Sequence, residues 1–178
     1  LLESGLGLKR KTLDLKINNN WTSVGSEIKS KLEKSTAEKF QHVGSTAVKG
    51  LLSKPILDLL LVYSSGNLSD KTIQTLEELG FTYKGDIISR VQKTEVKRRR
   101  HFFALYNKEK TIDFIHIHAL PKDDPEAHNF LLFRDKLRED PKKVELYNQF
   151  KQGLLKKKIS REEYRLSKKN IVKEIIRN

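Results

Sequence analysis

The run Ile56–Tyr63 is the feature that most restricts how this chain can fold. Apart from Asp58 it is continuously apolar, and it follows Pro55, so it indicates a strand buried on both faces of a sheet. A carboxylate in such a strand is costly unless it is ionised against a cation or accepts hydrogen bonds. Asp58 is therefore either a functional carboxylate or one that a loop amide satisfies at the entrance of the strand.

The other elements follow from apolar spacing and turn signals. Further strands are expected at about 39–43, 81–83, 101–106 and 111–119, and helices at about 21–34, 69–79, 125–138, 141–155 and from Ser160 onward. This order indicates an α+β fold: a mixed, mainly antiparallel sheet flanked by helices, with a helical C-terminal third packed against it. We expect a single domain over residues 1–178, with a core over about 20–120 and the helical part over 121–178.

Positive charge dominates the composition. Lys and Arg number 36, Asp and Glu number 23, and the net charge is +13, which attracts polyanions, either nucleic acid or phosphorylated small molecules. Cysteine is absent, which excludes disulfide scaffolds, thiolate zinc sites and cysteine nucleophiles. No apolar stretch approaches the roughly 20 residues of a membrane span, and charges replace a signal core near the start. We expect a cytoplasmic protein without membrane association, whose native beginning lies upstream of Leu1 because the chain contains no Met.

The positive charge is clustered. Residues 97–100 form one basic block and 156–158 another. Alternation along a strand would place Arg100 and Phe102 on one side, so that a cationic side chain faces a ligand from a rigid element. For the C-terminal block, a solvated lysine-rich surface is an equal alternative. Zinc-finger spacing, an RNP-type aromatic strand and a basic region before heptads are all absent from the sequence, so no known nucleic-acid module is indicated.

A turn of small residues separates the strand that ends at Val43 from the strand that begins at Ile56. Gly44 lets the backbone approach a ligand closely, and Ser45 and Thr46 add hydroxyl and amide donors. Such donors suit phosphate oxygens. The turn therefore predicts a phosphate-binding site next to the strand that carries the buried carboxylate.

Two histidines stand out on a later strand. His116 and His118 are two residues apart, so both imidazoles project from one face, together with Ile112, whereas Asp113 lies on the other. Beside Asp58 they would form a two-histidine, one-carboxylate set able to hold a divalent metal. They could instead bind phosphate or transfer protons near neutral pH. The plain alternative is that one histidine packs in the core while the other is exposed.

Two helical motifs add further cationic groups. Arg134 and Arg138 are four residues apart, so they project from one helix face and could reach phosphate bidentately. Asp135 beside them is also typical of a solvated face. Tyr164 and Lys168 have the same spacing on the last helix.

Together these motifs resemble the signature of the GrpB family of bacterial proteins. The resemblance rests on five motifs in order: residues 42–58, Arg100-x-Phe102-Phe103, His116-x-His118, residues 133–138 and Tyr164-x-x-x-Lys168. It covers about residues 20–176. The family belongs by its fold to the nucleotidyltransferase superfamily of the polymerase-beta type, which implies a nucleotidyltransferase-like core. Relatives fused to dephospho-coenzyme A kinase hint at nucleotide or coenzyme A metabolism.

The resemblance implies a metal-dependent site that lacks one member. The superfamily template has Gly-Ser, about a dozen residues, two acids flanking a hydrophobic residue on the second strand, and a third acid on a later strand, which together hold two ions. Gly44, Ser45 and Asp58 fit this template, but Leu60 occupies the second acid position and leucine cannot ligate a metal. The classical two-magnesium site is therefore impaired.

The resemblance also implies the roles of individual residues. The implied catalytic and metal-binding residues are Asp58, His116 and His118, with Mg²⁺ or Mn²⁺ ahead of Zn²⁺. The implied phosphate- or nucleotide-binding residues are His42, Gly44, Ser45, Thr46, Lys54, Arg100, Arg134 and Lys168. Three functions stay open: a nucleotidyltransferase-like or phosphate-ester enzyme with a single metal, an inactive protein that binds a nucleotide or phosphorylated metabolite as a sensor or accessory domain, and a nucleic-acid-binding module driven by the charge.

Overall fold

The computed structural model describes residues 15–64, 66–86, 100–107, 111–157 and 159–177. The basic residues 97–99, Lys158 and the tip of the connection at 108–110 lie outside this part of the chain. The elements in chain order are α1 (Trp21–Thr36), β1 (Phe40–Val43), the 3₁₀ turn η1 (Ser45–Ala47), β2 (Ile56–Tyr63), α2 (Asp70–Glu78), β3 (Thr82–Asp86), β4 (His101–Tyr106), β5 (Phe114–Pro121), α3 (Pro125–Glu139), α4 (Pro141–Lys156) and α5 (Arg161–Arg177).

The strands form one mixed sheet in the order β1-β2-β5-β4-β3. β2 and β5 are parallel, and every other neighbouring pair is antiparallel. The sequence therefore predicted the α+β class and the mainly antiparallel sheet correctly. Both faces of β2 are covered, one by the main core and the other by the cluster at α3, which explains why its sequence is almost continuously apolar. The register of the parallel pair places Asp58 opposite His116.

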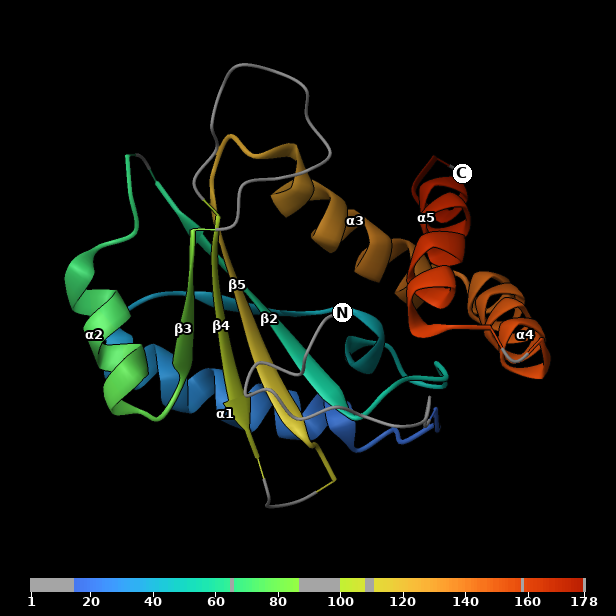
Figure 1. Ribbon diagram of the computed structural model, residues 1–178, viewed down its shortest axis with the longest axis horizontal. Coiled ribbons are helices and arrows are strands. Elements are labelled where there is room, and N and C mark those ends of the chain that lie inside the picture. Colours follow the sequence, from blue (N-terminus) through green and yellow to red (C-terminus); the bar gives the residue numbers. More distant parts are fainter. Residues whose placement is uncertain (1–14, 65, 87–99, 108–110, 158, 178) are drawn as a thin grey trace.

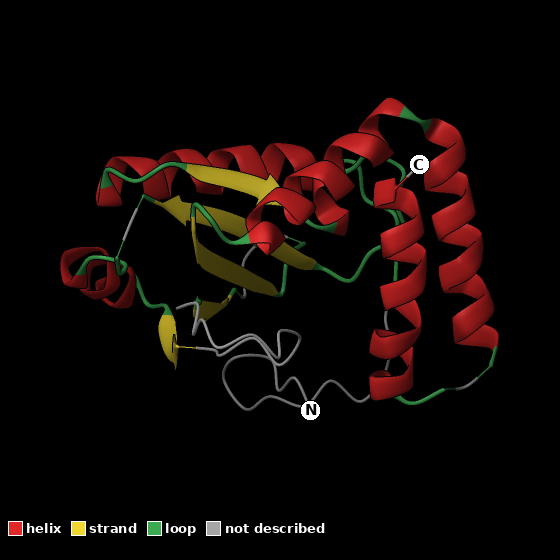
Figure 2. Ribbon diagram, turned by 90° about the horizontal axis from the view of Figure 1, so that it is seen from above, coloured by secondary structure: helices red, strands yellow, loops and turns green. Residues whose placement is uncertain are grey.

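Helices α1 and α2 cover one face of the sheet (Figures 1 and 2). Trp21 and Leu32 of α1 and Leu76 of α2 pack there against the odd-numbered residues of the central strands, including Leu59 and Ile117. The Trp21 indole donates a hydrogen bond to the Thr111 hydroxyl over 3.0 Å, which ties the start of α1 to the segment before β5. This face holds the main hydrophobic core.

Helix α3 crosses the opposite face, where the even-numbered residues of β2 and β5 project. A smaller apolar cluster forms there around Val43, Leu60, Leu120 and Ala127. Leu60, at the position where the superfamily template has its second acid, is fully buried in this cluster. Its apolar surroundings stabilise a leucine and would penalise a carboxylate.

Helices α3, α4 and α5 form a third packed region beside the sheet (Figure 2). Phe133, Tyr147 and Ile171, one from each helix, meet Val48 and Leu51 from the segment that follows the 3₁₀ turn. The helical C-terminal part is thus packed against the residues that connect β1 to β2. This contact places α4 and α5 within reach of the Gly44–Ala47 turn.

Local sequence signals account for the helix starts. Asp124 and Asp140 cap α3 and α4 by accepting backbone hydrogen bonds, and a proline follows each cap in the first helical turn. Before α5, the Ser160 hydroxyl accepts from the Glu163 amide and the Glu163 carboxylate accepts from the Ser160 amide. This reciprocal pair is the capping box that the sequence predicts.

One strand begins later than the sequence indicates. The strand expected at 111–119 runs over Phe114–Pro121 instead, because the Asp113 amide still donates to the Pro55 carbonyl. Ile112 therefore does not share the face of His116 and His118: it is buried in the main core on the α1 side. The expectation that alternation extends back to Ile112 was wrong.

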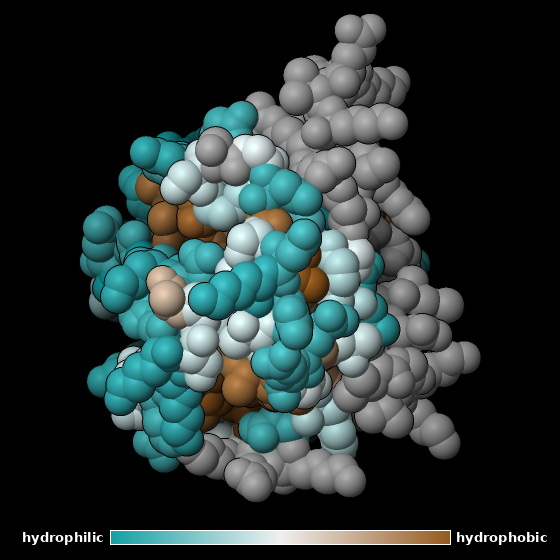
Figure 3. Space-filling model, turned by 90° about the vertical axis from the view of Figure 1, so that its left-hand side faces the viewer, coloured by the Kyte–Doolittle hydropathy of each residue, from teal (hydrophilic) through white to brown (hydrophobic). Residues whose placement is uncertain are grey.

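The side of the molecule seen in Figure 3 is mostly polar. On the side of the molecule that carries α2, hydrophilic side chains cover most of the surface, and hydrophobic ones appear only as small separate patches (Figure 3). Among the described residues, no helix combines the length and the hydropathy that a membrane crossing requires.

Candidate functional site

The site is centred on Asp58, which projects from β2 toward the same sheet face as two imidazoles from β5. Its Oδ1 lies 3.3 Å from His118 Nε2 and 3.5 Å from His116 Nδ1. The parallel register produces this meeting, because it sets Asp58 beside His116 and places His118 two residues further along the same face. About a quarter of the Asp58 side chain, 26%, is exposed, so the group is accessible to a ligand.

Asp58 is ionised at neutral pH. Burial by itself would raise the pKa of its carboxyl, but hydrogen bonds from His116 and His118, with their charges when protonated, outweigh that effect and bring the pKa well below its usual range. The buried carboxylate that is costly on sequence grounds is therefore satisfied by the imidazoles of the neighbouring strand, not by a loop amide at the entrance of β2.

The Gly44 turn is pressed directly against this carboxylate. Gly44 has a φ of 71°, and a Cβ at this position would lie 2.7 Å from Asp58 Oδ2. Only glycine tolerates both the backbone conformation and the approach. The 3₁₀ turn Ser45–Ala47 follows at once, so the turn begins at the residue after this close contact.

His42 and Thr46, which the resemblance implies to bind phosphate, make their polar contacts within the protein. The Thr46 hydroxyl donates to the Ile56 carbonyl over 3.0 Å, so it accepts the hydrogen bond from His42 Nε2, also 3.0 Å long. The His42 ring lies on the α1 side of the sheet, where a Cβ on Gly25 would collide with it. Both side chains are buried and use their polar atoms inside the protein.

Burial also controls the charge of His42. Desolvation lowers its pKa to about 4, while Asp58 acts in the opposite direction and Arg138 and Arg134 reinforce the lowering. His42 is therefore neutral at physiological pH, and its hydrogen bond with Thr46 stabilises the Gly44–Ala47 turn.

A buried lysine that sequence reasoning missed lies behind the turn. Lys151 of α4 is only 2% exposed, and its Nζ donates to the Ser45 hydroxyl over 3.1 Å and to the Leu52 carbonyl. It also lies 4.1 Å from the centre of the Tyr147 ring. A signal for it was present in the sequence: Lys151 follows the apolar Tyr147 by four residues, so it interrupts the buried stripe of its helix.

Two further lysines gather around a tyrosine of α5. Lys54 and Lys168 place their Nζ atoms 5.3 and 5.0 Å from the centre of the Tyr164 ring. With Lys151 they form what we call the lysine cluster. The pKa of Lys151 is lowered mainly by burial and further by the charges of Lys168 and Lys54. Of the residues predicted to bind phosphate, Ser45 contacts Lys151, and Lys54 and Lys168 lie at the ring of Tyr164. Their role in phosphate binding stays a prediction.

The lysine cluster interacts electrostatically with Asp58, which we call the Asp58 group when taken together with His116 and His118. Burial lowers the pKa of Lys168, and the negative charge of Asp58 acts against this lowering. Within the described chain no carboxylate bonds to Lys151, whose Nζ has only a hydroxyl and a carbonyl as acceptors. Lys151 is thus a buried lysine without a carboxylate partner among the described residues, and Lys168 interacts with the charge of Asp58.

Arg100 and Arg134 are used differently from the sequence expectation. Arg100 binds both oxygens of Asp124, the buried cap of α3, and its Nη2 lies 2.7 Å from Oδ1. Arg134 binds both oxygens of its neighbour Asp135 over 2.7 and 3.1 Å. Each guanidinium is paired with a carboxylate of this chain.

Aromatic rings surround the two imidazoles. The Phe102 ring lies 5.1 Å from that of His116 and 5.2 Å from that of His118, and Phe130 of α3 lies 5.0 Å from His118. His116 Nε2 is buried and has no hydrogen-bond partner within the described part of the chain. These rings exclude water from one side of the Asp58 group, which strengthens its electrostatic interactions.

No metal centre is formed by the described residues: none of their His, Asp and Glu side chains makes a group of three or more with the geometry to hold an ion. The Asp58 group has the right types of donor atom for a metal. However, His116 Nδ1 and His118 Nε2 both point at Oδ1 of Asp58. Metal binding by Asp58, His116 and His118 therefore stays a prediction.

Residues 15–178 match the family described as GrpB protein. The chain belongs to the GrpB family. It is 32% identical over 164 residues to the glutamate-rich protein GrpB of Alkalihalophilus pseudofirmus, covering 89% of this chain and 90% of that protein. It is 33% identical over 141 residues to a UPF0157 protein of Pseudomonas aeruginosa, covering 76% of this chain and 53% of the relative, so it spans about half the length of that protein.

The solved structure of a family member shows the same fold. The crystal structure of the conserved protein GrpB from Enterococcus faecalis matches with a TM-score of 0.67 at 24% identity and covers 92% of this chain and 98% of that one. The Cid1 poly(U) polymerase, in the H336N mutant bound to MgATP, matches with a TM-score of 0.48 at 17% identity over 73% of this chain and 41% of that one. Neither match identifies an activity.

Proposed function

We propose that this GrpB protein binds the phosphate groups of a nucleotide or another phosphorylated small molecule at Ser45 and the lysine cluster, and that Asp58, His116 and His118 act on the reacting end of that ligand in a nucleotidyl-transfer type of reaction. The observation that carries the proposal is the contact of the lysine cluster with the Gly-Ser turn, in which Lys151 donates to the Ser45 hydroxyl. The charge of Asp58 acts on Lys168 of the same cluster.

The lysine cluster supports an anionic ligand for a physical reason. Three ammonium groups that lie near one another repel, and burial of Lys151 adds a desolvation cost. A fold keeps such a costly arrangement when function requires it. An anion placed next to Ser45 would relieve the repulsion, and the Ser45 hydroxyl, which already accepts from Lys151, has its own proton to donate.

The Asp58 group supplies the groups for chemistry at a phosphoryl centre. If a divalent ion binds there, Asp58, His116 and His118 hold it, and the ion polarises a phosphoryl oxygen. Two imidazoles with one carboxylate suit Mn²⁺ or Zn²⁺ better than Mg²⁺, which prefers oxygen ligands. Without an ion, an imidazole hydrogen-bonded to Asp58 can still accept or donate a proton. Leu60 leaves no second carboxylate on β2 for a second ion.

The test is a calorimetric and thermal-shift screen of nucleotides and coenzyme A precursors, with and without Mg²⁺, Mn²⁺ and Zn²⁺. Lys168→Met should abolish ligand binding, whereas Lys169→Met, which removes an exposed neighbouring charge, should not. Asp58→Asn should abolish metal-dependent binding or turnover while the fold stays intact. Equal binding by the Lys168 and Lys169 variants would contradict the proposal.

A sensor or accessory function is the second candidate, and Leu60 favours it because the superfamily's second metal-binding acid is missing. It predicts ligand-induced stabilisation without product, which persists in the presence of a chelator. The net charge of +13 keeps a nucleic-acid-binding function as the third. That function predicts affinity for random oligonucleotides that falls steeply with salt.

A further inference from the structure

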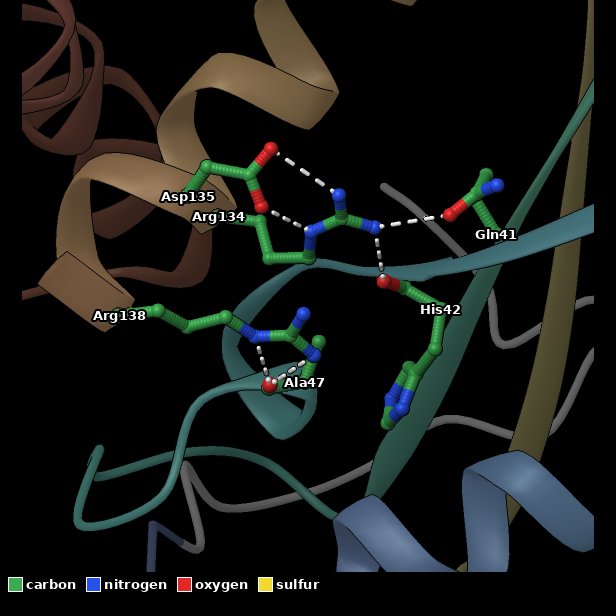
Figure 4. Close-up of polar contacts among 6 residues, drawn as sticks. All are labelled: Gln41, His42, Ala47, Arg134, Asp135 and Arg138. Atoms are coloured by element: carbon green, nitrogen blue, oxygen red, sulfur yellow. Dashed lines mark hydrogen bonds and ion pairs between the residues drawn. The ribbon is translucent and has the colours of Figure 1, made fainter.

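Two arginines of helix α3 donate hydrogen bonds to backbone carbonyls at the Gly44–Ala47 turn. Arg138 donates to the Ala47 carbonyl from both Nε and Nη2, over 3.0 and 2.8 Å. One turn earlier on the helix, Arg134 Nη1 donates to the His42 carbonyl over 3.2 Å and to the Gln41 side chain over 3.2 Å (Figure 4).

The two carbonyls lie at opposite ends of the turn. His42 precedes Gly44 by two residues, and Ala47 is the last residue of the 3₁₀ turn, so the arginines fix both ends while Gly44, Ser45 and Thr46 lie between them. Figure 4 shows the two guanidinium groups coming from one helix, with the His42 ring pointing away from that of Arg134. A planar guanidinium holds its acceptor in a defined direction, which an ammonium does not.

The helix that carries the arginines is itself fixed. Phe133 and Leu137, next to the arginines in sequence, are buried against Val48 and Leu51, directly after the turn. Asp135 binds two nitrogens of Arg134, which leaves the third nitrogen aimed at β1. The Arg134 side chain is only 11% exposed. Residues of the 133–138 motif thus contact the turn through the two arginines and the segment after it through Phe133 and Leu137.

We propose that Arg134 and Arg138 are positioning residues that hold the turn so that Ser45 meets Lys151 and Gly44 stays against Asp58, and that they do not contact the ligand. This inference rests on the proposed function, because it assigns these arginines a role in ligand binding through Ser45. It replaces direct phosphate contact by Arg134.

A double-mutant cycle tests the inference. The affinity for pyrophosphate is measured by calorimetry for the wild type, Arg138→Gln, Ser45→Ala and the double variant. Arg138→Gln should weaken binding by about tenfold, but by less than about twofold in the Ser45→Ala background, because groups that act through one another are not additive. Additive losses in the cycle would overturn the inference. Lys136→Gln, on the same helix, is the charge control and should bind as the wild type does.

Arg138→Lys separates positioning from charge. Lysine keeps the positive charge but not the two-pronged contact with the Ala47 carbonyl, so binding should stay weakened, and full affinity in this variant would overturn the inference. The His42 imidazole gives a spectroscopic readout by NMR. Since the charge of Arg138 helps to lower the pKa of His42, that pKa should rise in Arg138→Gln and stay lowered in Arg138→Lys.

The outcomes distinguish this inference from the proposed function. If the wild type binds pyrophosphate and Arg138→Gln binds it equally well at an unchanged melting temperature, the positioning role is wrong and the proposed function stands. If the wild type does not bind pyrophosphate, both fail. Thermal unfolding of every variant shows whether its loss of affinity comes from a folded protein.

Discussion

The burial of Lys151 lowers the stability of the fold, while its proposed role is to bind an anionic ligand. Its ammonium is almost completely buried, with one hydroxyl and one carbonyl as acceptors and two other lysines nearby. An apolar side chain of similar length would avoid the desolvation and the repulsion, at the cost of leaving the Leu52 carbonyl without this donor.

Lys151→Met should therefore change stability little while removing ligand binding. We expect the free energy of unfolding in urea to stay within about 1 kcal/mol of the wild type, because the two effects offset each other. Pyrophosphate binding, measured by calorimetry on the same preparation, should be lost. A variant that unfolds much more easily and still binds would show that Lys151 is a structural residue only.

His42 predicts a specific dependence of stability on pH. Its pKa is about 4 in the folded protein and 6.5 in the unfolded reference, so the unfolded state takes up more protons between these values. Stability contributed by neutral His42 is complete above pH 6.5 and is lost as the pH falls toward 4, by up to about 3 kcal/mol.

The measurement is urea unfolding of the wild type and His42→Gln at pH 7 and pH 5. The wild type should lose stability at pH 5, whereas the variant, which keeps a donor for Thr46 but does not titrate, should show a smaller loss. Asp58 does not disturb this comparison, because its lowered pKa moves its contribution to more acidic solution. Equal losses in both proteins would contradict the assignment.

Among the elements, the start of the 3₁₀ turn restricts the choice of residue most strongly, because position 44 requires glycine. Gly44 and Gly50 both have positive φ, at 71° and 75°, but a Cβ on Gly50 would meet nothing closer than 4.0 Å. Gly50 is therefore a control for the positive φ of Gly44, without the contact with Asp58.

Gly50→Ala should cost about 1 kcal/mol of stability from backbone strain alone. Gly44→Ala should cost at least about 1 kcal/mol more, because the turn must also move away from the Asp58 carboxylate. Urea unfolding gives both values. If the two substitutions cost the same, the turn has room to move and the close approach does not constrain the site.

The elements also show what sequence can and cannot predict. The boundaries of β2 and α3 and the capping box at Ser160 followed from local patterns, and so did the shared face of His116 and His118. The face on which His42 lies depends on sheet pairing and on the packing of Gly25 against it, which no local pattern reports. Arg100 and Arg134 were predicted to face phosphate because a sequence shows the charge of an arginine but not its partner.

For the whole molecule, the proposed ligand site joins the sheet to the helical C-terminal part. Ser45 and Lys54 come from the connection between β1 and β2, whereas Lys151 and Lys168 come from α4 and α5. A ligand that contacts both groups should stabilise both parts together, and at a hundred times its Kd it should add about 2.7 kcal/mol to the free energy of unfolding.

Unfolding with and without pyrophosphate tests this expectation. Fluorescence of Trp21 reports on the sheet and its core, and far-ultraviolet circular dichroism is dominated by the helices. The two signals should change in a single shared transition that moves to higher urea with ligand. Separate transitions would show that the two parts unfold independently and would contradict the expectation of one domain.

The parallel pairing of β2 with β5 has a consequence for the order in which the protein is made. Asp58 and His118 are sixty residues apart in the chain, and Lys151 lies 106 residues beyond Ser45. No early fragment of the chain can assemble the carboxylate, the imidazoles and the amines. On the proposed function, we therefore expect the nascent chain to bind no phosphorylated ligand until α5, which carries Lys168, has left the ribosome.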